Sequence, residues 1–395
     1  MPTPPLPVRY RALPVAVPVV ALLVLGTIAW AAAWRIGADS AVYRAGALTL
    51  LRGEPLYDLE PLATLPDWVR LPFTYPPAAA LLFVPLAAVP EGLAWGVLGA
   101  VSVLALAVTI RVCARDSCRW SRWGVVAALT VAALALEPVW KTLFLGQINL
   151  ILMALVVVDV LVVCAPGRSS RWGGVLVGVA AAVKLTPLIF VAHLLFTGRW
   201  RDALRGLGTF VALQGLMFAL IPGDVAKYWT QAVSDPERVG SVHWIFNQSL
   251  NGLLARLSGG ASWAGPAAIG IGAALAVPAV WLVVRLYRRG EALPALLVTA
   301  AYGLLLSPVS WSHHWVWAVP LAVWLLGLGR YRLAVAVTAF FLIAVIMFVP
   351  NGAEAEFDWG PIAFTLGNAY VLAAAGVLLA AAVRERLRLS AGAPR

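Results

Sequence analysis

The sequence predicts an all-α, polytopic integral membrane protein, and three observations support that fold class. The chain is 62% hydrophobic and only 12% charged, whereas soluble domains run at about 45–50% apolar and about 25% charged. Apolar runs of roughly 20 residues recur along the whole length. Basic residues stand in short clusters between these runs, which is the pattern of membrane topology and not of a nucleic-acid binder, despite a net charge of +11.

The apolar runs define the expected elements in order. They lie near 13–34, 76–89, 92–111, 123–138, 148–164, 173–184, 186–197, 206–221, 264–284, 292–309, 315–329, 333–349 and 362–383. The first resembles a secretory signal, but at about 20 residues it is long enough to span, so we expect a retained helix. The set predicts about 10–12 membrane helices in one integral domain, residues 1–395, without a soluble module.

Basic clusters predict the orientation, because positive charge in short loops marks the cytoplasmic side. They lie at 111–122, 168–171, 199–205, 285–289, 330–332 and 384–388. All fall on one side if run 76–89 does not cross fully and if 173–197 forms a re-entrant hairpin around Lys184. Both runs are short enough for this. In the alternative, every short run crosses the membrane, and the clusters at 111–122 and 168–171 then lie on the extracytoplasmic side.

Polar segments then gather at the extracytoplasmic side. They are the first loop 35–75, the corner 137–149, the second long loop 222–262, the corner 307–315 and the loop 350–361. No Walker loop, G-x-G-x-x-G or H-E-x-x-H motif occurs in the chain. Cys113, Cys118 and Cys164 lie near cytoplasmic ends and lack the spacing of a zinc site.

Residues 40–52 read as an amphipathic helix on the membrane surface, with Asp39 at its start. Asp39 is either an N-cap that accepts a backbone N–H, or a general base for a hydroxyl group. Asp58 is a second carboxylate in the same loop, and a solvated turn residue is its simpler interpretation. Tyr75 precedes two prolines that suit a helix start, and its interfacial position is ordinary.

Gly146-Gln147-Ile148-Asn149 opens a span at its outer end. The amides of Gln147 and Asn149 are candidates for bonds to sugar hydroxyls, although a helix start explains them nearly as well. Lys184 is an ionisable residue inside a membrane segment, which marks a functional candidate. It either faces an anionic phosphate or pairs with Asp159.

Ser307–Trp315 contains His313 and His314, two of only four histidines. Adjacent helical side chains point about 100° apart, so a chelating metal pair is a poor interpretation. A lipid phosphate held by imidazole N–H groups is the better one. The polar patch Asn247–Gly252, near His243, is more consistent with a structural role.

Seven motifs in order carry a family resemblance. They are D-x-x-x-Y-R, L-x-x-G-x-x-L-Y, F-T-Y-P-P, G-Q-x-N-x-x-L, G-x-x-x-x-x-K-L-T-P, Arg199-Trp200-Arg201 and S-P-x-S-W-S-H-H. Over roughly 35–330 the chain resembles glycosyltransferase family 87, the actinobacterial polyprenol-phosphate-mannose-dependent α-(1→2)-mannosyltransferases with the GT-C fold.

The resemblance implies an inverting, metal-independent transfer on the outer face of the cytoplasmic membrane, with no cofactor. The donor is polyprenyl-phosphate-mannose and the acceptor a phosphatidylinositol mannoside or lipomannan-type glycolipid. Asp39 matches the family's catalytic carboxylate, with Asp58 left open as the base. The expected donor-phosphate ligands are His313, His314, Arg44 and Lys184, and the expected substrate contacts are Tyr43, Asp58, Tyr75, Gln147 and Asn149.

Other functions remain open from the sequence. A transporter would show paired broken helices at the membrane midplane, and only one such break occurs here. A flippase or ligase of lipid-linked sugars, or a GT-C transferase of another sugar such as arabinofuranose, is a closer rival. The oligomeric state has no signal in the sequence.

Overall fold

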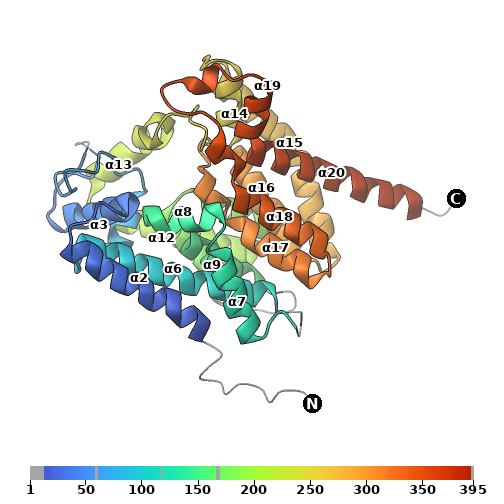
Figure 1. Ribbon diagram of the computed structural model, residues 1–395, viewed down its shortest axis with the longest axis horizontal. Helices are drawn as coiled ribbons and strands as arrows, with labels where there is room; N and C mark the ends of the chain where they lie inside the picture. Colours follow the sequence, from blue (N-terminus) through green and yellow to red (C-terminus); the bar gives the residue numbers. More distant parts are fainter. Residues whose placement is uncertain (1–12, 58–60, 116, 118, 166–169, 393–395) are drawn as a thin grey trace.

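The computed structural model describes residues 13–57, 61–115, 117, 119–165 and 170–392. Helices and turns make up this part of the chain, and the described residues form no strand beyond one isolated bridge between Asn247 and Trp311. The first half of the chain packs at one side of the molecule and the second half at the other, with α20 projecting away (Figure 1). The fold is thus the all-α membrane architecture that the composition predicts.

The helices of the first part are α2 Leu13–Ala31, α3 Ala38–Leu51, α4 Pro77–Leu82, α5 Val84–Ala87, α6 Glu91–Cys113, α7 Trp123–Ala133, α8 Glu137–Leu145, α9 Asn149–Val158 and the π turn η1 Asp159–Val163. The middle part holds α10 Val175–Val183, η2 Thr186–Leu188, α11 Ile189–Phe196, α12 Trp200–Leu220, α13 Pro222–Thr230, η3 Ala232–Ser234, η4 Pro236–Val239 and α14 Leu250–Leu257. The last part holds α15 Ala264–Arg288, α16 Ala292–Leu306, η5 Ser312–Trp317, α17 Ala318–Gly327, α18 Tyr331–Ile343, η6 Val345–Phe348, η7 Ala355–Phe357, α19 Pro361–Gly367 and α20 Ala369–Gly392.

Several of these helices are long and apolar enough to cross a bilayer. Within the described residues, four qualify alone: Glu91–Cys113, Trp200–Leu220, Ala264–Arg288 and Tyr331–Phe348. Two bent pairs qualify only if each is counted as one broken span: α7 with α8, bent by 76°, and α19 with α20, bent by 74°. Shorter apolar helices cover Val15–Ala31, Asn149–Val163, Thr186–Phe196 and Ala292–Leu306.

The first helix packs closely against α6. A Cβ on Gly96 would lie 2.8 Å from the Cα of Gly26 and 2.6 Å from the carbonyl oxygen of Leu22. Small residues let two backbones approach in this way inside a membrane, where dispersion contacts replace the hydrophobic effect as the driving force. The contact fixes α2 against the helix that begins beside the site.

Run 76–89 is two short helices, α4 and α5, of six and four residues, so it is too short to span, as the sequence predicts. They cover α3, which is packed more fully than a surface helix. Ser40 and Thr49 are buried, whereas Leu51 is 61% exposed. The polar and apolar positions of this helix therefore do not divide between water and lipid as expected, because neighbouring segments cover both.

The predicted hairpin around Lys184 is present. Gly178 on α10 and Val191 on α11 both lie against Gly206 of α12, so the two arms double back on each other. Lys184 at the turn has an extended backbone, with φ −148° and ψ 132°. Arms of nine and eight residues are well short of a span.

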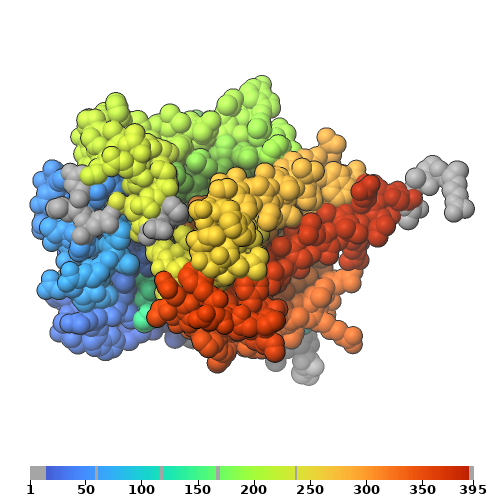
Figure 2. Space-filling model, turned by 90° about the horizontal axis from the view of Figure 1, so that it is seen from above, coloured from blue at the N-terminus to red at the C-terminus, as the bar shows by residue number. Residues whose placement is uncertain are grey.

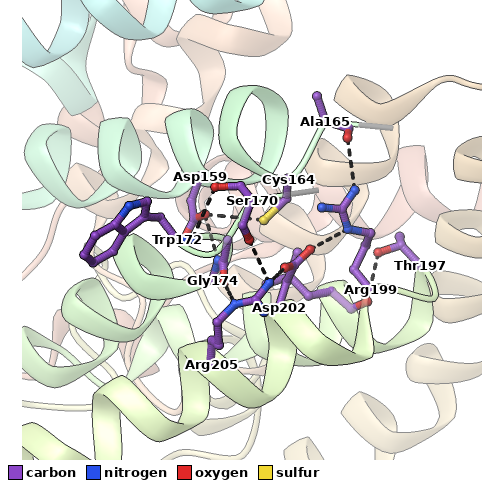
Figure 3. A network of polar contacts seen from close by, with 12 residues as sticks. Asp159, Cys164, Ala165, Ser170, Trp172, Gly174, Thr197, Arg199, Asp202 and Arg205 are labelled. Atoms are coloured by element: carbon purple, nitrogen blue, oxygen red, sulfur yellow. Dashed lines mark hydrogen bonds and ion pairs between the residues drawn. The ribbon is translucent and has the colours of Figure 1, made fainter. Parts of the chain in front are cut away.

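Asp159 closes the other end of this hairpin. Its carboxylate accepts the backbone N–H groups of Gly174 and Val177, each at 2.9 Å, and so caps α10 (Figure 3). Beside it, Asp202 pairs with Arg199 and Arg205. The suggested pairing of Lys184 with Asp159 is therefore wrong: Asp159 is used at the start of α10 and Lys184 stands after its end.

The five polar segments meet at one end of the molecule. The N–H of Leu56 donates to Asp224, joining the first loop to 222–262 at 2.9 Å. The N–H of Ile245 donates to Glu356 at 3.2 Å, which joins 222–262 to 350–361. Figure 2 shows this face, with the yellow segment after 240 beside the orange-red one near 350.

Buried amides of the patch Asn247–Gly252 serve this junction. Asn247 accepts from the N–H of Ser310 at 3.0 Å, and Gln248 donates to the carbonyl oxygens of Ile245 and Gly367. These side chains satisfy backbone groups where irregular segments are buried, which is the structural role expected of them.

Candidate active site

Asp39 lies in the first turn of α3, near the beginning of the first loop, 35–75. Gly37 is the N-cap of this helix, with φ +75°, and no side chain caps it. Asp39 therefore does not act as the N-cap, one of the two roles that the sequence left open. The carboxyl group is enclosed by protein, while the residue as a whole stays partly accessible.

Gln147 reaches Asp39 because the turn between α8 and α9 approaches α3 very closely. Gly146 has φ +71°, and a Cβ there would lie 2.6 Å from the hydroxyl oxygen of Ser40. Glycine satisfies both demands, the left-handed backbone and the close approach. The side chain of Gln147 is thereby brought near the Asp39 carboxylate, whose ionised form it favours.

Two tyrosines fix the orientation of that amide. The Tyr43 hydroxyl donates to Gln147 Oε1 at 2.9 Å and lies 3.0 Å from the Tyr75 hydroxyl. The Tyr43 ring stacks on Phe83 with centroids 4.3 Å apart. Because Oε1 accepts from the tyrosine, the amide NH₂ is the group turned toward Asp39. Tyr43, Tyr75 and Gln147 thus form one buried chain that ends at the carboxylate.

Asp39 has the properties of a base that works near neutral pH. Burial raises its pKa to about 6, while the Gln147 amide and the charge of Lys184 act in the opposite direction. The desolvation effect is the larger, as expected for a carboxylate withdrawn from water. Lys184 therefore belongs to the same site, although no described ion pair joins it directly to Asp39.

Lys184 binds the histidine segment. Its ammonium donates to Asn149 Oδ1 at 3.2 Å and to His314 Nε2 at 2.9 Å. Burial, with the charge of Lys184 and the neighbouring His313, holds the pKa of His314 well below its usual range. His314 is accordingly a neutral imidazole whose Nε2 accepts, because an ammonium group only donates.

His313 is buried beside His314, with ring centroids 4.8 Å apart and the rings perpendicular. Its carbonyl oxygen accepts from Thr142 and from Asn149, each at 3.1 Å. Neither ring nitrogen has a hydrogen-bond partner within the described chain. An orphaned buried imidazole is costly and points to a group that arrives from outside.

Arg44 and Asp58 stand differently from the other candidates. Arg44 Nε donates to the Val89 carbonyl oxygen at 2.7 Å, and its charge acts on Glu91, so its described contacts hold the turn before α6. Asp58 lies outside the described residues. The structure thus brings together Asp39, Tyr43, Tyr75, Gln147, Asn149, Lys184, His313 and His314.

Sequence reasoning missed a polar group on α8. Glu137 and Lys141 form an ion pair at 3.4 Å, and both contact Ser312. Their i,i+4 spacing beside an apolar run was the available signal, since such a pair faces one side of a helix.

A cavity leads away from Lys184 and His314. Its polar end also contains Asn149 and Ser310. The other walls are mostly apolar and come from α9, α11, α16 and η5: Leu152, Met153, Val156, Ile189, Phe190, Leu304, Val316 and Trp317. Thr186 and Ser307 are further polar residues of the lining. A cavity with cationic and amide groups and a mostly apolar remainder suits an amphiphile with an anionic head.

Comparison with known proteins identifies relatives over most of the chain. The family model for glycosyltransferase family 87 matches residues 73–308. The chain is 33% identical over 350 residues to a polyprenol-phosphate-mannose-dependent alpha-(1-2)-phosphatidylinositol mannoside mannosyltransferase of Mycobacterium tuberculosis, covering 82% of this chain and 79% of that protein. It is also 34% identical over 366 residues to a polyprenol-phosphate-mannose-dependent alpha-(1-2)-phosphatidylinositol pentamannoside mannosyltransferase of Mycobacterium tuberculosis. That match covers 90% of this chain and 81% of that protein.

A weaker relative acts on another sugar. An alpha-(1->3)-arabinofuranosyltransferase of Corynebacterium glutamicum is 29% identical over 188 residues, 46% of this chain and 42% of its own length. No solved structure matches the chain significantly.

Proposed function

The chain belongs to glycosyltransferase family 87, and from that premise we propose that it transfers mannose from polyprenyl-phosphate-mannose to a mannosylated glycolipid. The observation that carries the proposal is the arrangement of Asp39 and Lys184. A carboxylate and an ammonium, both partly buried, share one site, and the ammonium lines a mostly apolar cavity.

The donor fits this cavity by its chemistry. We place the phosphate at Lys184 and the histidine pair, with the isoprenoid chain along the walls formed by α9, α11 and α16. Charge-assisted hydrogen bonds to phosphate are strong in a site without water, and isoprenoid units are wholly apolar. The donor can then enter from the bilayer, because the lipid itself carries the activated sugar.

The reaction is a single displacement in this proposal. Asp39 accepts the proton of the acceptor hydroxyl as that oxygen bonds the anomeric carbon, and the bond from this carbon to the phosphate oxygen breaks. A β-linked donor thus yields an α-linked product, in an α-(1→2) linkage by analogy with the relatives' names. Lys184 and the N–H groups of the histidines stabilise the charge that develops on the leaving phosphate.

In this proposal the site faces the outer side of the cytoplasmic membrane. Trp95, near the start of α6, lies against Gly37 and Gly146, while the last turn of this 23-residue helix carries Arg111. At about 1.5 Å per residue the helix crosses a bilayer. The guanidinium of Arg111 stacks over Trp123 at the far end, which is the basic, cytoplasmic end by the positive-inside rule.

Purified protein given polyprenyl-phosphate-mannose and a panel of phosphatidylinositol mannosides tests the proposal by mass spectrometry. A product heavier by one hexose is expected, and it should persist in EDTA because the chemistry places no metal in the reaction. The likeness to an arabinofuranosyltransferase makes a polyprenyl-phosphate-arabinose donor the second candidate. Movement of intact donor across vesicles without any product would contradict transferase function.

A further inference from the structure

A buried ion pair lies outside the group around Asp39 and is not used in the proposed displacement. Glu137 and Lys141, one turn apart on α8, are 3.4 Å apart, and their side chains are 0% and 13% exposed. A buried pair is often no more stable than an apolar pair of the same volume, because desolvating two charges is expensive. Its value must therefore be sought in what it holds in place.

Both residues of the pair form hydrogen bonds with the segment that carries the histidines. The Ser312 hydroxyl donates to Glu137 Oε1 at 2.6 Å and accepts from Lys141 Nζ at 3.1 Å. The next residue of α8, Thr142, donates to the carbonyl oxygen of the next residue of η5, His313, at 3.1 Å. Two successive residues of η5, Ser312 and His313, are thus both held by side chains of α8.

We propose that the Glu137–Lys141 pair is a positioning device that sets the His313–His314 segment for the donor phosphate. The inference rests on the proposed function and deepens it. With Ser312 both donating and accepting, its hydroxyl has one orientation, and η5 cannot turn about its first residue without breaking a charge-assisted bond. Lys141 does not line the cavity, so it acts through Ser312 and is not itself a catalytic residue.

The same pair connects two distant segments. The Tyr370 hydroxyl of α20 donates to Glu137 Oε2 at 3.3 Å. Lys141 Nζ lies 3.1 Å from the centroid of the Phe246 ring, in the second long loop. The histidine segment is therefore connected through these two side chains to α20 and to the second long loop.

Ser312→Ala is the sharpest test, because it removes the link and leaves the ion pair itself intact. Ser102→Ala is the matched control, since Ser102 is a buried serine on α6 whose hydroxyl has no partner in the described chain. We expect kcat/KM for the donor to fall roughly 10- to 100-fold in Ser312→Ala, the range for a small misplacement of reacting groups. The acceptor KM and the melting temperature should match those of Ser102→Ala.

A second variant guards against misfolding. Glu137→Gln/Lys141→Met removes both charges together, so no unpaired charge is left buried, and it should show the same loss toward the donor. Wild-type donor kcat/KM in both variants would overturn the inference. If the wild-type protein transfers no mannose, the proposed function fails instead, and binding of polyprenyl phosphate decides the inference: equal affinity in wild type and Ser312→Ala rejects it.

Discussion

At the scale of single residues, Asp39 is defined by the groups that surround it. Burial raises its pKa to about 6, and a chain of two tyrosine hydroxyls and one amide orients it. The sequence identified Asp39, Tyr43, Tyr75 and Gln147 as separate candidates. It could not show that they are connected, because Tyr43 and Gln147 are 104 positions apart and only the fold joins them.

The pH dependence of turnover follows from this environment. A general base works in its ionised form, so on the acidic side kcat/KM should reach half its plateau near pH 6, level off about one unit above it and fall about tenfold per unit well below it. Gln147→Leu removes an amide that favours the ionised carboxylate, which raises the pKa of Asp39 further and moves the acidic limb to higher pH. Steady-state kinetics between pH 4.5 and 8, values chosen to bracket the limb by about two units, measures this.

Gln214→Leu is the control for that experiment. Gln214 is a buried amide on α12 whose side-chain nitrogen and oxygen have no partner in the described chain. Its replacement should leave the limb near pH 6. An unchanged limb in Gln147→Leu would mean that the amide does not act on Asp39.

At the scale of elements, the sequence was most informative where length and charge decide. The short runs 76–89 and 173–197 could be recognised as too short to span, and the structure shows two short helices and a hairpin there. The faces of α3 were not recognisable, because the residues that bury Ser40 and Thr49 come from other segments. The Glu137–Lys141 pair was hidden for the same reason: its partner Ser312 is on a distant element.

The contact between α2 and α6 predicts a stability effect. In Gly96→Ala the new methyl group meets backbone atoms at 2.6 and 2.8 Å, so the two helices must separate. We expect a loss of about 1–3 kcal/mol, the usual cost of overpacking. Gly124→Ala on α7 is the matched control, because a Cβ there meets nothing within 4 Å.

Thermal unfolding in detergent measures both variants. Gly124→Ala should be neutral or slightly more stable, since alanine favours a helix over glycine. A melting temperature of Gly96→Ala equal to that of Gly124→Ala would show that the close packing of α2 on α6 contributes little.

At the scale of the whole molecule, five polar segments that are far apart in sequence meet at one end, and the basic turn after α6 lies at the other. Composition and charge predicted this separation of polar and basic segments without a structure, because basic residues in short loops mark one side of a membrane. The site itself needed the fold, since α3, the α8–α9 turn, the Lys184 hairpin and η5 each supply part of it.

Membrane orientation can be measured with cysteines. In a variant without native cysteines, Asp67→Cys in the first loop should react with a membrane-impermeant maleimide in intact cells. Arg122→Cys, in a basic cluster, should react only after the membrane is permeabilised. The opposite pattern would place the site on the cytoplasmic side and contradict the proposed topology.

The central claim is that Asp39 takes the proton of the acceptor, and single-turnover mannose transfer by Asp39→Asn tests it most directly. Asp67→Asn, an exposed carboxylate of the same loop, is the control. We predict that transfer falls by roughly 10²- to 10⁴-fold in Asp39→Asn, the contribution of a general base, while donor binding and the Asp67→Asn rate stay at wild-type values. Transfer by folded Asp39→Asn at a near wild-type rate would contradict the account.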